Sequence, residues 1–188
     1  MMSFVILVAL LIVFWAVGAY QRLLRQRKQC RTAFSQVDAL ALHRHELMPA
    51  LVRVCRERMP QQVDALDALL AADKAILAAY AHAGRHALDA AAIAPLNEAE
   101  AALETALGAV FALVPHSDSA SSEDLSRLIE ELGAAESRMA FARQVYNEAA
   151  RHYNAARAQF PGSVVAAVFA FTPVAALPDA GMRQPDRL

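Results

Sequence analysis

The fold is decided by residues 122–160, which read SEDLSRLIEELGAAESRMAFARQVYNEAARHYNAARAQF. Their apolar residues recur in alternating steps of three and four over about five heptads, a pattern typical of a long helix that packs along one side. One column of this seam is made of large residues: Leu125, Leu132, Met139, Tyr146, Tyr153 and Phe160. The other column is mostly small: Leu128, Ala135, Ala142, Ala149 and Ala156.

The small column predicts how closely this helix is packed. Small residues let a neighbouring backbone approach, while the large residues beside them fill the flanking space. The seam leaves open whether the partner helix belongs to the same chain or to another. Ala150 lies off the seam, so we expect it to be exposed. Asn147 and Asn154 stand next to large seam residues, and we expect them to form hydrogen bonds across the bundle.

The N-terminus predicts a membrane anchor. Residues 1–19 carry no charged side chain, and about 20 predominantly apolar residues are needed to cross a bilayer. Trp15 and Tyr20 stand at one end of this run, as do the aromatic rings that settle at the headgroup boundary of membrane proteins. Five basic residues then precede the first acidic residue, Asp38. These basic residues, the basic collar, are Arg22, Arg25, Arg27, Lys28 and Arg31.

A cleaved signal peptide is the alternative interpretation of this segment. Residues 16–19, Ala-Val-Gly-Ala, offer small side chains to a peptidase. A signal peptide, however, carries its basic residues before the apolar run, whereas this chain carries them after it. We therefore predict an uncleaved, single-pass anchor in the inner (plasma) membrane, with the lipid bilayer as a partner and the bundle on the cytoplasmic side. The basic collar is also suited to bind anionic headgroups.

The helical pattern continues from the anchor without a break, so one helix is predicted to run to Met59-Pro60. Arg44 is the one polar residue at a position of its apolar stripe, and Pro49 should kink it. A second helix is predicted from about residue 61 to 83. Pro95 suits the first turn of a third helix, and the clearest loop, residues 115–122, separates the third helix from the fourth.

Composition agrees with a helical bundle. Hydrophobic residues make up 57% of the chain, and only 6 of 188 residues are glycine. We predict an all-α fold, in which an N-terminal transmembrane helix continues into an antiparallel four-helix-type bundle with long helices. The predicted division is an anchor at 1–21, a bundle at 22–162, and at 163–188 a short apolar segment followed by a tail that we expect to be disordered from Asp179. Val164–Phe171 is too short to span a bilayer, and either covers an end of the bundle or lies in the membrane interface.

No motif predicts an active site. The chain has no Gly-rich phosphate loop, no CxxC pair and no serine elbow, and its net charge of -1 gives no global field for nucleic acid. His82 and His86 have the spacing of two metal ligands on one helix, but they stand near a predicted helix end and are expected to be surface residues. We predict no catalytic residue, metal, cofactor or small-molecule substrate.

Three further polar or sulfur-bearing groups have structural interpretations. Cys30 and Cys55 lie on the apolar stripe of the first helix, about 37 Å apart if it is continuous, so we expect buried free thiols. Asp38, next to Arg31, Arg44 and His45, is expected to form a solvated ion pair.

In motif order and spacing, the chain resembles the LemA family. The matching segments are FSQVD at 34–38, RHELMPAL at 44–51, ESRM at 136–139, ARQVYN at 142–147, YN at 153–154, FP at 160–161, and Ala167, Phe169 and Phe171. Three positions depart from the family pattern: Ala50 replaces asparagine, Val114 replaces tyrosine and Ala170 replaces glycine. Residues 59–94 match weakly.

The resemblance implies a bacterial, single-pass helical-bundle protein and no particular reaction. One branch of the family is linked to the formation of magnetosome membranes, which keeps membrane organisation open as a role. Our first hypothesis is a non-enzymatic membrane protein that acts as an interaction platform or scaffold for other membrane proteins or for its own copies. The alternative is a membrane-remodelling or lipid-contacting protein that uses the basic collar and Val164–Phe171.

Overall fold

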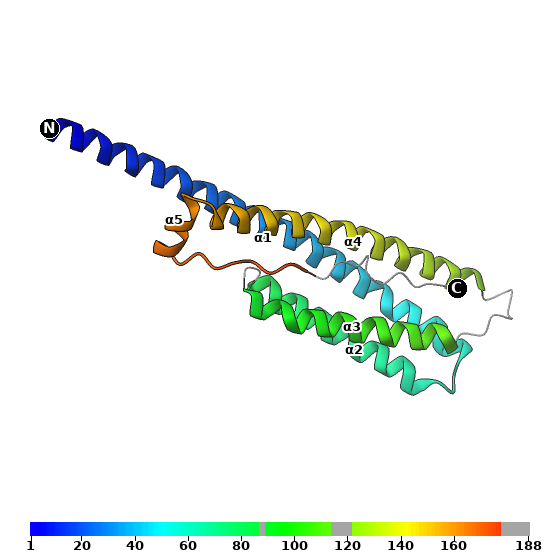
Figure 1. The fold of residues 1–188 in the computed structure, drawn as a ribbon. Helices are drawn as coiled ribbons and strands as arrows, with labels where there is room; N and C mark the ends of the chain where they lie inside the picture. The colour runs from blue at the N-terminus through cyan, green and yellow to red at the C-terminus, as the bar shows by residue number, and fades with distance from the viewer. Residues whose placement is uncertain (87–88, 114–121, 178–188) are drawn as a thin grey trace.

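The computed structural model describes residues 1–86, 89–113 and 122–177 (Figure 1). This part of the chain contains helices and no strand, which confirms the predicted all-α fold. The helices are α1 (Met2–Arg58), α2 (Val63–Arg85), α3 (Ala90–Leu113), α4 (Ser122–Ala158) and α5 (Gly162–Val168). The loop predicted at 115–122 lies outside the described residues except for its last position, and so does the tail predicted to be disordered from Asp179.

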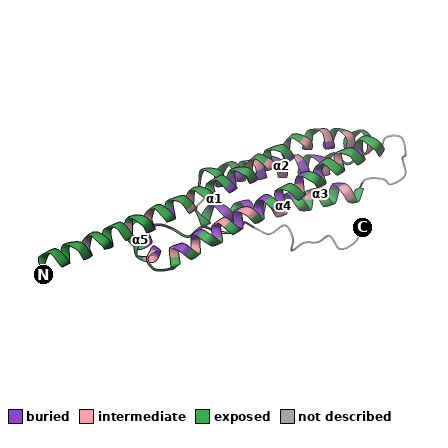
Figure 2. Ribbon diagram, turned by 90° about the horizontal axis from the view of Figure 1, so that it is seen from above, coloured by how far each residue is buried: buried purple, intermediate pink, exposed green. Residues whose placement is uncertain are grey.

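The segment predicted to be an anchor and the first bundle helix form one uninterrupted helix. α1 is 57 residues long and continues through Pro49, so the prediction of a single helix that ends at Met59-Pro60 is confirmed. Within the described residues, α1 alone is long and apolar enough to cross a membrane, by length and composition. Its first part projects from the bundle, and residues 1–8 and 10–15 are exposed (Figure 2).

The other helices pack around the remainder of α1. α4 runs back along α1 as its longest partner, α2 packs on another side of α1, and α3 packs on α2 (Figure 1). The small column of α4 faces the interior, with Ala135 0%, Ala142 5% and Ala156 7% exposed. The partner of the seam is therefore α1 of the same chain, because small side chains allow the two backbones to come close.

Two seam expectations differ from the structure. Ala150 was expected to be exposed but is buried, at 2% exposure, whereas Ala149 is only half-buried. The reason is that Ala150 lies between Asn147 and Asn154 on a face of α4 that the C-terminal segment covers, as described below. Phe160, the last residue of the large column, is 72% exposed because α4 ends two residues before it.

The third helix also begins earlier than predicted. α3 starts at Ala90, so Pro95 lies inside the helix rather than in its first turn. The start is fixed by Asp89, whose carboxylate accepts a hydrogen bond of 3.0 Å from the backbone N–H of Ala91. A side-chain oxygen in this position satisfies one of the backbone donors that a helix N-terminus leaves unpaired.

The chain turns sharply after α4 and folds back. Gly162 is required at this turn, because a Cβ atom there would lie 1.9 Å from the carbonyl oxygen of Ala156. α5 then buries Val165 and Ala166, and residues 171–177 follow as an extended segment, which we name the strap. Between α5 and the strap, Ala170 has a φ of 52°, a left-handed conformation in which the β-carbon is crowded.

Candidate functional site

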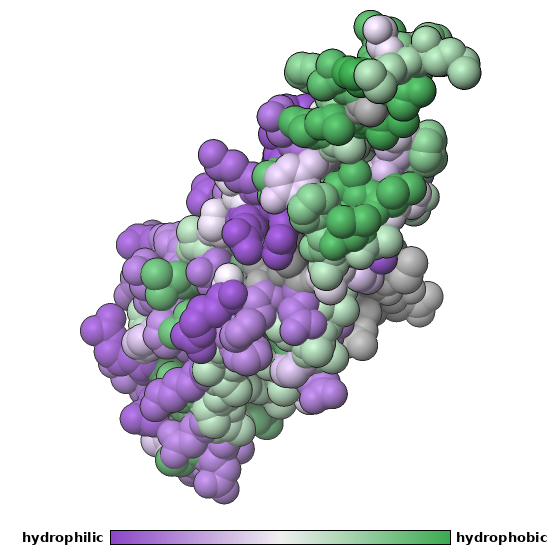
Figure 3. Space-filling model, turned by 90° about the vertical axis from the view of Figure 1, so that its left-hand side faces the viewer, coloured by the Kyte–Doolittle hydropathy of each residue, from purple (hydrophilic) through white to green (hydrophobic). Residues whose placement is uncertain are grey.

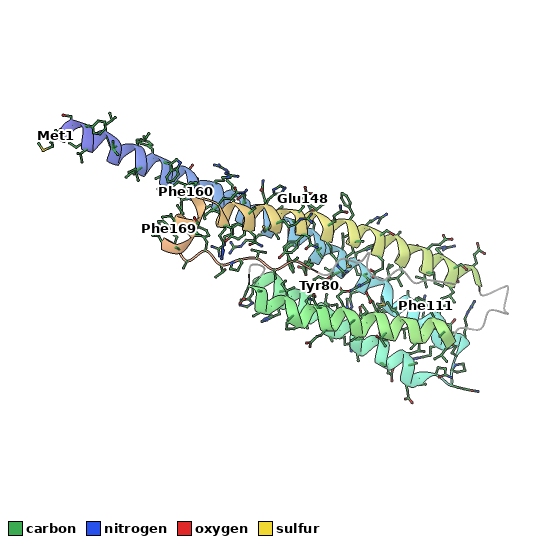
Figure 4. The ribbon with its side chains drawn as sticks, viewed as in Figure 1. Met1, Tyr80, Phe111, Glu148, Phe160 and Phe169 are labelled. Carbon is green, nitrogen blue, oxygen red and sulfur yellow. The ribbon has the colours of Figure 1, made fainter. Side chains whose placement is uncertain are left out.

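Aromatic rings gather where α1 leaves the bundle. Trp15 packs on Phe160 with ring centroids 4.6 Å apart, and Tyr20 packs on Phe169 at 4.8 Å and on Phe171 at 5.8 Å. The two residues predicted to mark the membrane boundary therefore contact the segment around α5, which lies beside α1 (Figure 4). Sequence reasoning proposed the aromatic boundary and the apolar segment Val164–Phe171 separately, but it did not predict the contact between them.

The basic collar lies on α1 immediately after Tyr20. Arg22, Arg25, Lys28 and Arg31 are exposed, and no ion pair joins them to a carboxylate among the described residues. Arg27 is half-buried, with its guanidinium 5.7 Å from the centre of the Phe171 ring, a cation–π contact. The collar thus leaves most of its positive charge available to an anionic surface.

Two Tyr-Asn pairs on α4 bind the backbone of the strap. Asn154 donates to the carbonyl oxygen of Val174 at 2.7 Å and accepts from its N–H at 3.0 Å. Asn147 makes the same pair of bonds to Leu177, at 2.9 and 2.8 Å. The hydroxyls of Tyr153 and Tyr146 donate to the carbonyl oxygens of Thr172 and Ala175. We name this set the Tyr–Asn ladder.

The spacing of the ladder follows from the rise of the two partners. The asparagines are seven residues apart on a helix, which is about 10.5 Å, whereas their partners are three residues apart on an extended chain, which is about 9–10 Å. Phe171, Val174 and Leu177 recur at the same interval of three and are buried. The asparagines were expected to bond across the bundle, and the structure instead pairs them with a segment whose extended form the sequence analysis did not predict.

A charged cluster lies at the centre of the bundle, in the region of Tyr80 in Figure 4. Glu100 of α3 meets Arg143 of α4 at 2.6 Å and Arg44 of α1 at 3.3 Å. Tyr80 of α2 donates to Glu100 at 2.7 Å and accepts from Arg143 at 2.9 Å. Arg44 also reaches Glu136 at 2.8 Å. The cluster joins all four long helices, and the side chains of Arg44, Glu100 and Arg143 are at most 6% exposed.

The ionisation of the cluster is fixed by its members. Burial alone would raise the pKa of Glu100, but Arg44 and Arg143 outweigh it and hold that pKa below its ordinary value. Burial raises the pKa of Tyr80, and the charge of Glu100 raises it further. Glu100 is therefore an anion and Tyr80 a neutral phenol near pH 7. A neutral, hydrogen-bonded phenol held between ion pairs ties the helices of the bundle to one another.

This cluster corrects one expectation. Arg44 and His45 were expected to form a solvated ion pair with Asp38, but Arg44 is buried against Glu100 and Glu136, and His45 pairs with Asp73 at 2.5 Å. The cause is the position of Arg44 on the stripe of α1, which turns its guanidinium inward. The sequence signal was present as the one polar residue of that stripe, but its partners lie 56 and 92 residues away.

The two candidate histidines and the two cysteines take the places that sequence reasoning gave them. His82 and His86 are exposed, with ring centroids 4.8 Å apart, and His86 Nδ1 lies 3.1 Å from the carbonyl oxygen of His82. In the described part of the chain, no three His, Cys, Asp or Glu side chains are grouped to hold a metal ion. Cys30 and Cys55 are buried free thiols, and burial raises the pKa of both.

Comparison with known proteins agrees with the motifs. A search of curated proteins found no match. The family model described as the LemA family matches residues 33–184, which include the Tyr–Asn ladder, the strap and the central charged cluster. Since this match covers most of the chain, the protein belongs to the LemA family.

Proposed function

We propose that this protein is a non-enzymatic scaffold anchored in the inner membrane, where its helical bundle presents an outer surface to other membrane proteins or to its own copies. The observation that carries the proposal is how the polar residues of the interior are used. The Tyr–Asn ladder holds the strap, and the charged cluster ties the four long helices. These groups are committed to the fold itself, which leaves the outer surface for partners.

The proposed orientation places the bundle in the cytoplasm. It rests on the basic collar, because clusters of arginine and lysine next to a span stay on the cytoplasmic side. A thiol label can test it, since both native cysteines are buried. Ser137→Cys, at an exposed position, should react with a membrane-impermeant maleimide only after the inner membrane is permeabilised. Labelling of intact spheroplasts would place the bundle outside and contradict the proposal.

The outer surface has one prominent apolar feature on the α1–α4 side. Phe141 is 68% exposed and stands beside a shallow hollow of about 610 Å³. The hollow is lined by Gln36, Ala39, Leu40, Ser137, Arg138, Phe141 and Ala142. Exposed aromatic residues are enriched where proteins bind one another. We propose that this surface, the Phe141 face, receives the partner.

Site-specific crosslinking in native membranes tests this face. A photoreactive benzoylphenylalanine in place of Phe141 should give a discrete adduct, with twice the mass of the chain if the partner is a second copy. The same residue in place of Arg151, which is exposed on the same helix, serves as the control. Equal and diffuse crosslinking at both positions would count against a docking surface at Phe141.

A further inference from the structure

The segment that joins α4 to the strap is apolar and poorly covered. Residues 160–171, which we name the apolar elbow, contain no charged side chain. One side of the elbow is packed, since Val165 and Ala166 are 5% and 7% exposed. The opposite side is open, and its exposed residues are Phe160 at 72%, Val164 at 53%, Val168 at 72% and Phe169 at 58%. A contiguous apolar surface of this kind marks a contact with a partner or a membrane.

The elbow lies at a defined level along α1. Phe160 contacts the ring of Trp15, and Phe169 contacts the ring of Tyr20. These contacts fix the elbow beside the last part of the apolar run, before the basic collar begins. Any position of α1 in a bilayer therefore also sets the depth of the elbow.

The junction between the apolar run and the basic collar determines that depth. From Met2, where α1 begins, to Tyr20 the helix rises about 28 Å, close to the thickness of about 30 Å of the hydrocarbon core. Arg22, the first charged residue after the run, belongs outside the hydrocarbon, so Tyr20 stands near the boundary of the core. Trp15 then lies about 7 Å deeper, and Phe160, which packs on it, lies at or within the boundary.

A hollow lies between the elbow and α1. Its lining changes from apolar to basic along α1, as a bilayer leaflet changes from acyl chains to charged headgroups. The hollow measures about 310 Å³. Trp15, Gly18 and Ala19 line it on the side of the apolar run, and Arg22 lines it on the side of the collar. Seen from the anchor end, the hydrophobic surface of α1 continues onto the adjoining end of the bundle, with hydrophilic residues next to it (Figure 3).

We propose that the apolar elbow inserts into the leaflet that α1 enters from the bundle, so that this end of the bundle is embedded at the boundary between acyl chains and headgroups. The occupant of the open side is lipid, because the elbow is continuous with the apolar surface of the anchor and lies level with it. The inference rests on the proposed anchor but not on the Phe141 face. The bundle is then held to the bilayer surface by the elbow as well as by the anchor.

Tryptophan fluorescence in vesicles tests the insertion. The full chain has a single tryptophan, Trp15, so Trp15→Phe gives a silent background. In this background, Phe169→Trp should be quenched by lipids brominated near the start of the acyl chain and should resist iodide in the water several-fold more than the control. Ile129→Trp is the control, because Ile129 is 42% exposed and lies near the start of α4, whereas the elbow follows the end of this helix. The vesicles are phosphatidylcholine with phosphatidylglycerol.

Each other outcome overturns the inference. Access of iodide to Phe169→Trp equal to that of Ile129→Trp would place the elbow in water. Protection from both quenchers would show that protein, such as a second copy, covers the elbow. The unmodified chain tests the proposed anchor separately. If brominated lipid fails to quench Trp15 in this chain, the anchor itself is refuted. If Phe169→Trp loses helical circular dichroism, Val168→Trp, at 72% exposure, replaces it.

Discussion

Removing one asparagine of the Tyr–Asn ladder should loosen the strap at a single place. Asn154 makes two hydrogen bonds to the backbone of Val174, one as donor and one as acceptor. Asn154→Ala removes both, and each is worth about 0.5–1.5 kcal/mol net. Opening the strap at this position should therefore become easier by about 1–3 kcal/mol. The strap should stay attached, because Phe171, Val174 and Leu177 remain buried by apolar contacts.

Amide hydrogen exchange measures this opening directly. At about 1.4 kcal/mol for each factor of ten, the expected loss raises exchange at Val174 by about 5- to 140-fold. The assay uses the full chain in detergent micelles, with exchange followed residue by residue. Gln144→Ala is the matched control, because Gln144 is an exposed polar residue on the same helix, and its loss should change stability by less than about 0.5 kcal/mol.

The prediction also has a positional signature. Asn147 pairs with Leu177 one heptad away, so Asn147→Ala should speed exchange most at Leu177, whereas Asn154→Ala acts most at Val174. If Asn154→Ala exchanges at Val174 as slowly as Gln144→Ala does, the side-chain bonds do not hold the strap. The explanation of the seven-residue spacing would then fail with them.

Three further predictions concern the core, a turn and pH. Ala142→Leu should cost about 1–3 kcal/mol by overpacking against α1, whereas exposed Ala134→Leu should stay within about 0.5 kcal/mol; urea unfolding compares them. Ala170→Gly should stabilise by about 0.5–1 kcal/mol and raise Tm, because the left-handed φ of 52° costs alanine more than glycine. The pKa of Glu100 lies below its ordinary 4.5, so its contribution to stability is complete above that pH and is lost as pH falls through the folded pKa. Glu100→Gln should therefore lower the free energy of unfolding by about 3–5 kcal/mol at pH 7, since two buried arginines lose their partner. The variant should also lose less stability than the unmodified chain as the pH falls, which thermal melts from pH 3 to 7 measure.

The long helices were predictable because their signals are periodic and local. The seam of α4 and the unbroken stripe of α1 each repeat over many turns, so no single residue decides the result. Ala150 shows the limit of this reasoning. A heptad pattern marks the face that meets one partner helix, whereas the strap covers a second face of α4, where Asn147 and Asn154 are the visible residues. An alanine between two asparagines carries no signal of burial by itself.

The charged cluster could not be assembled from sequence alone. Arg44 was visible as an exception on an apolar stripe, but many carboxylates could have been its partner. Which of them it meets depends on how α1, α3 and α4 are aligned, and the seam does not fix that alignment to within one turn. The sequence signal for the strap was weaker. Phe171, Val174 and Leu177 repeat every three residues, which is the period of a polyproline II helix, but the repeat covers only seven residues.

The ladder and the apolar elbow are mechanically one unit. The elbow is held against α4 at Gly162, which lies close to the carbonyl of Ala156, and again at Phe171, whose carbonyl oxygen accepts a hydrogen bond from Arg157 at 3.1 Å. Both contacts are therefore made with adjacent residues of the last turn of α4, and the Tyr–Asn ladder holds the strap that follows. Because the clamp holds Val165 and Ala166 inward, the open side of the elbow cannot turn into the bundle and remains presented beside α1. The paired Tyr-Asn motif at residues 146–147 and 153–154 thus acts on the position of an apolar surface that begins at Phe160.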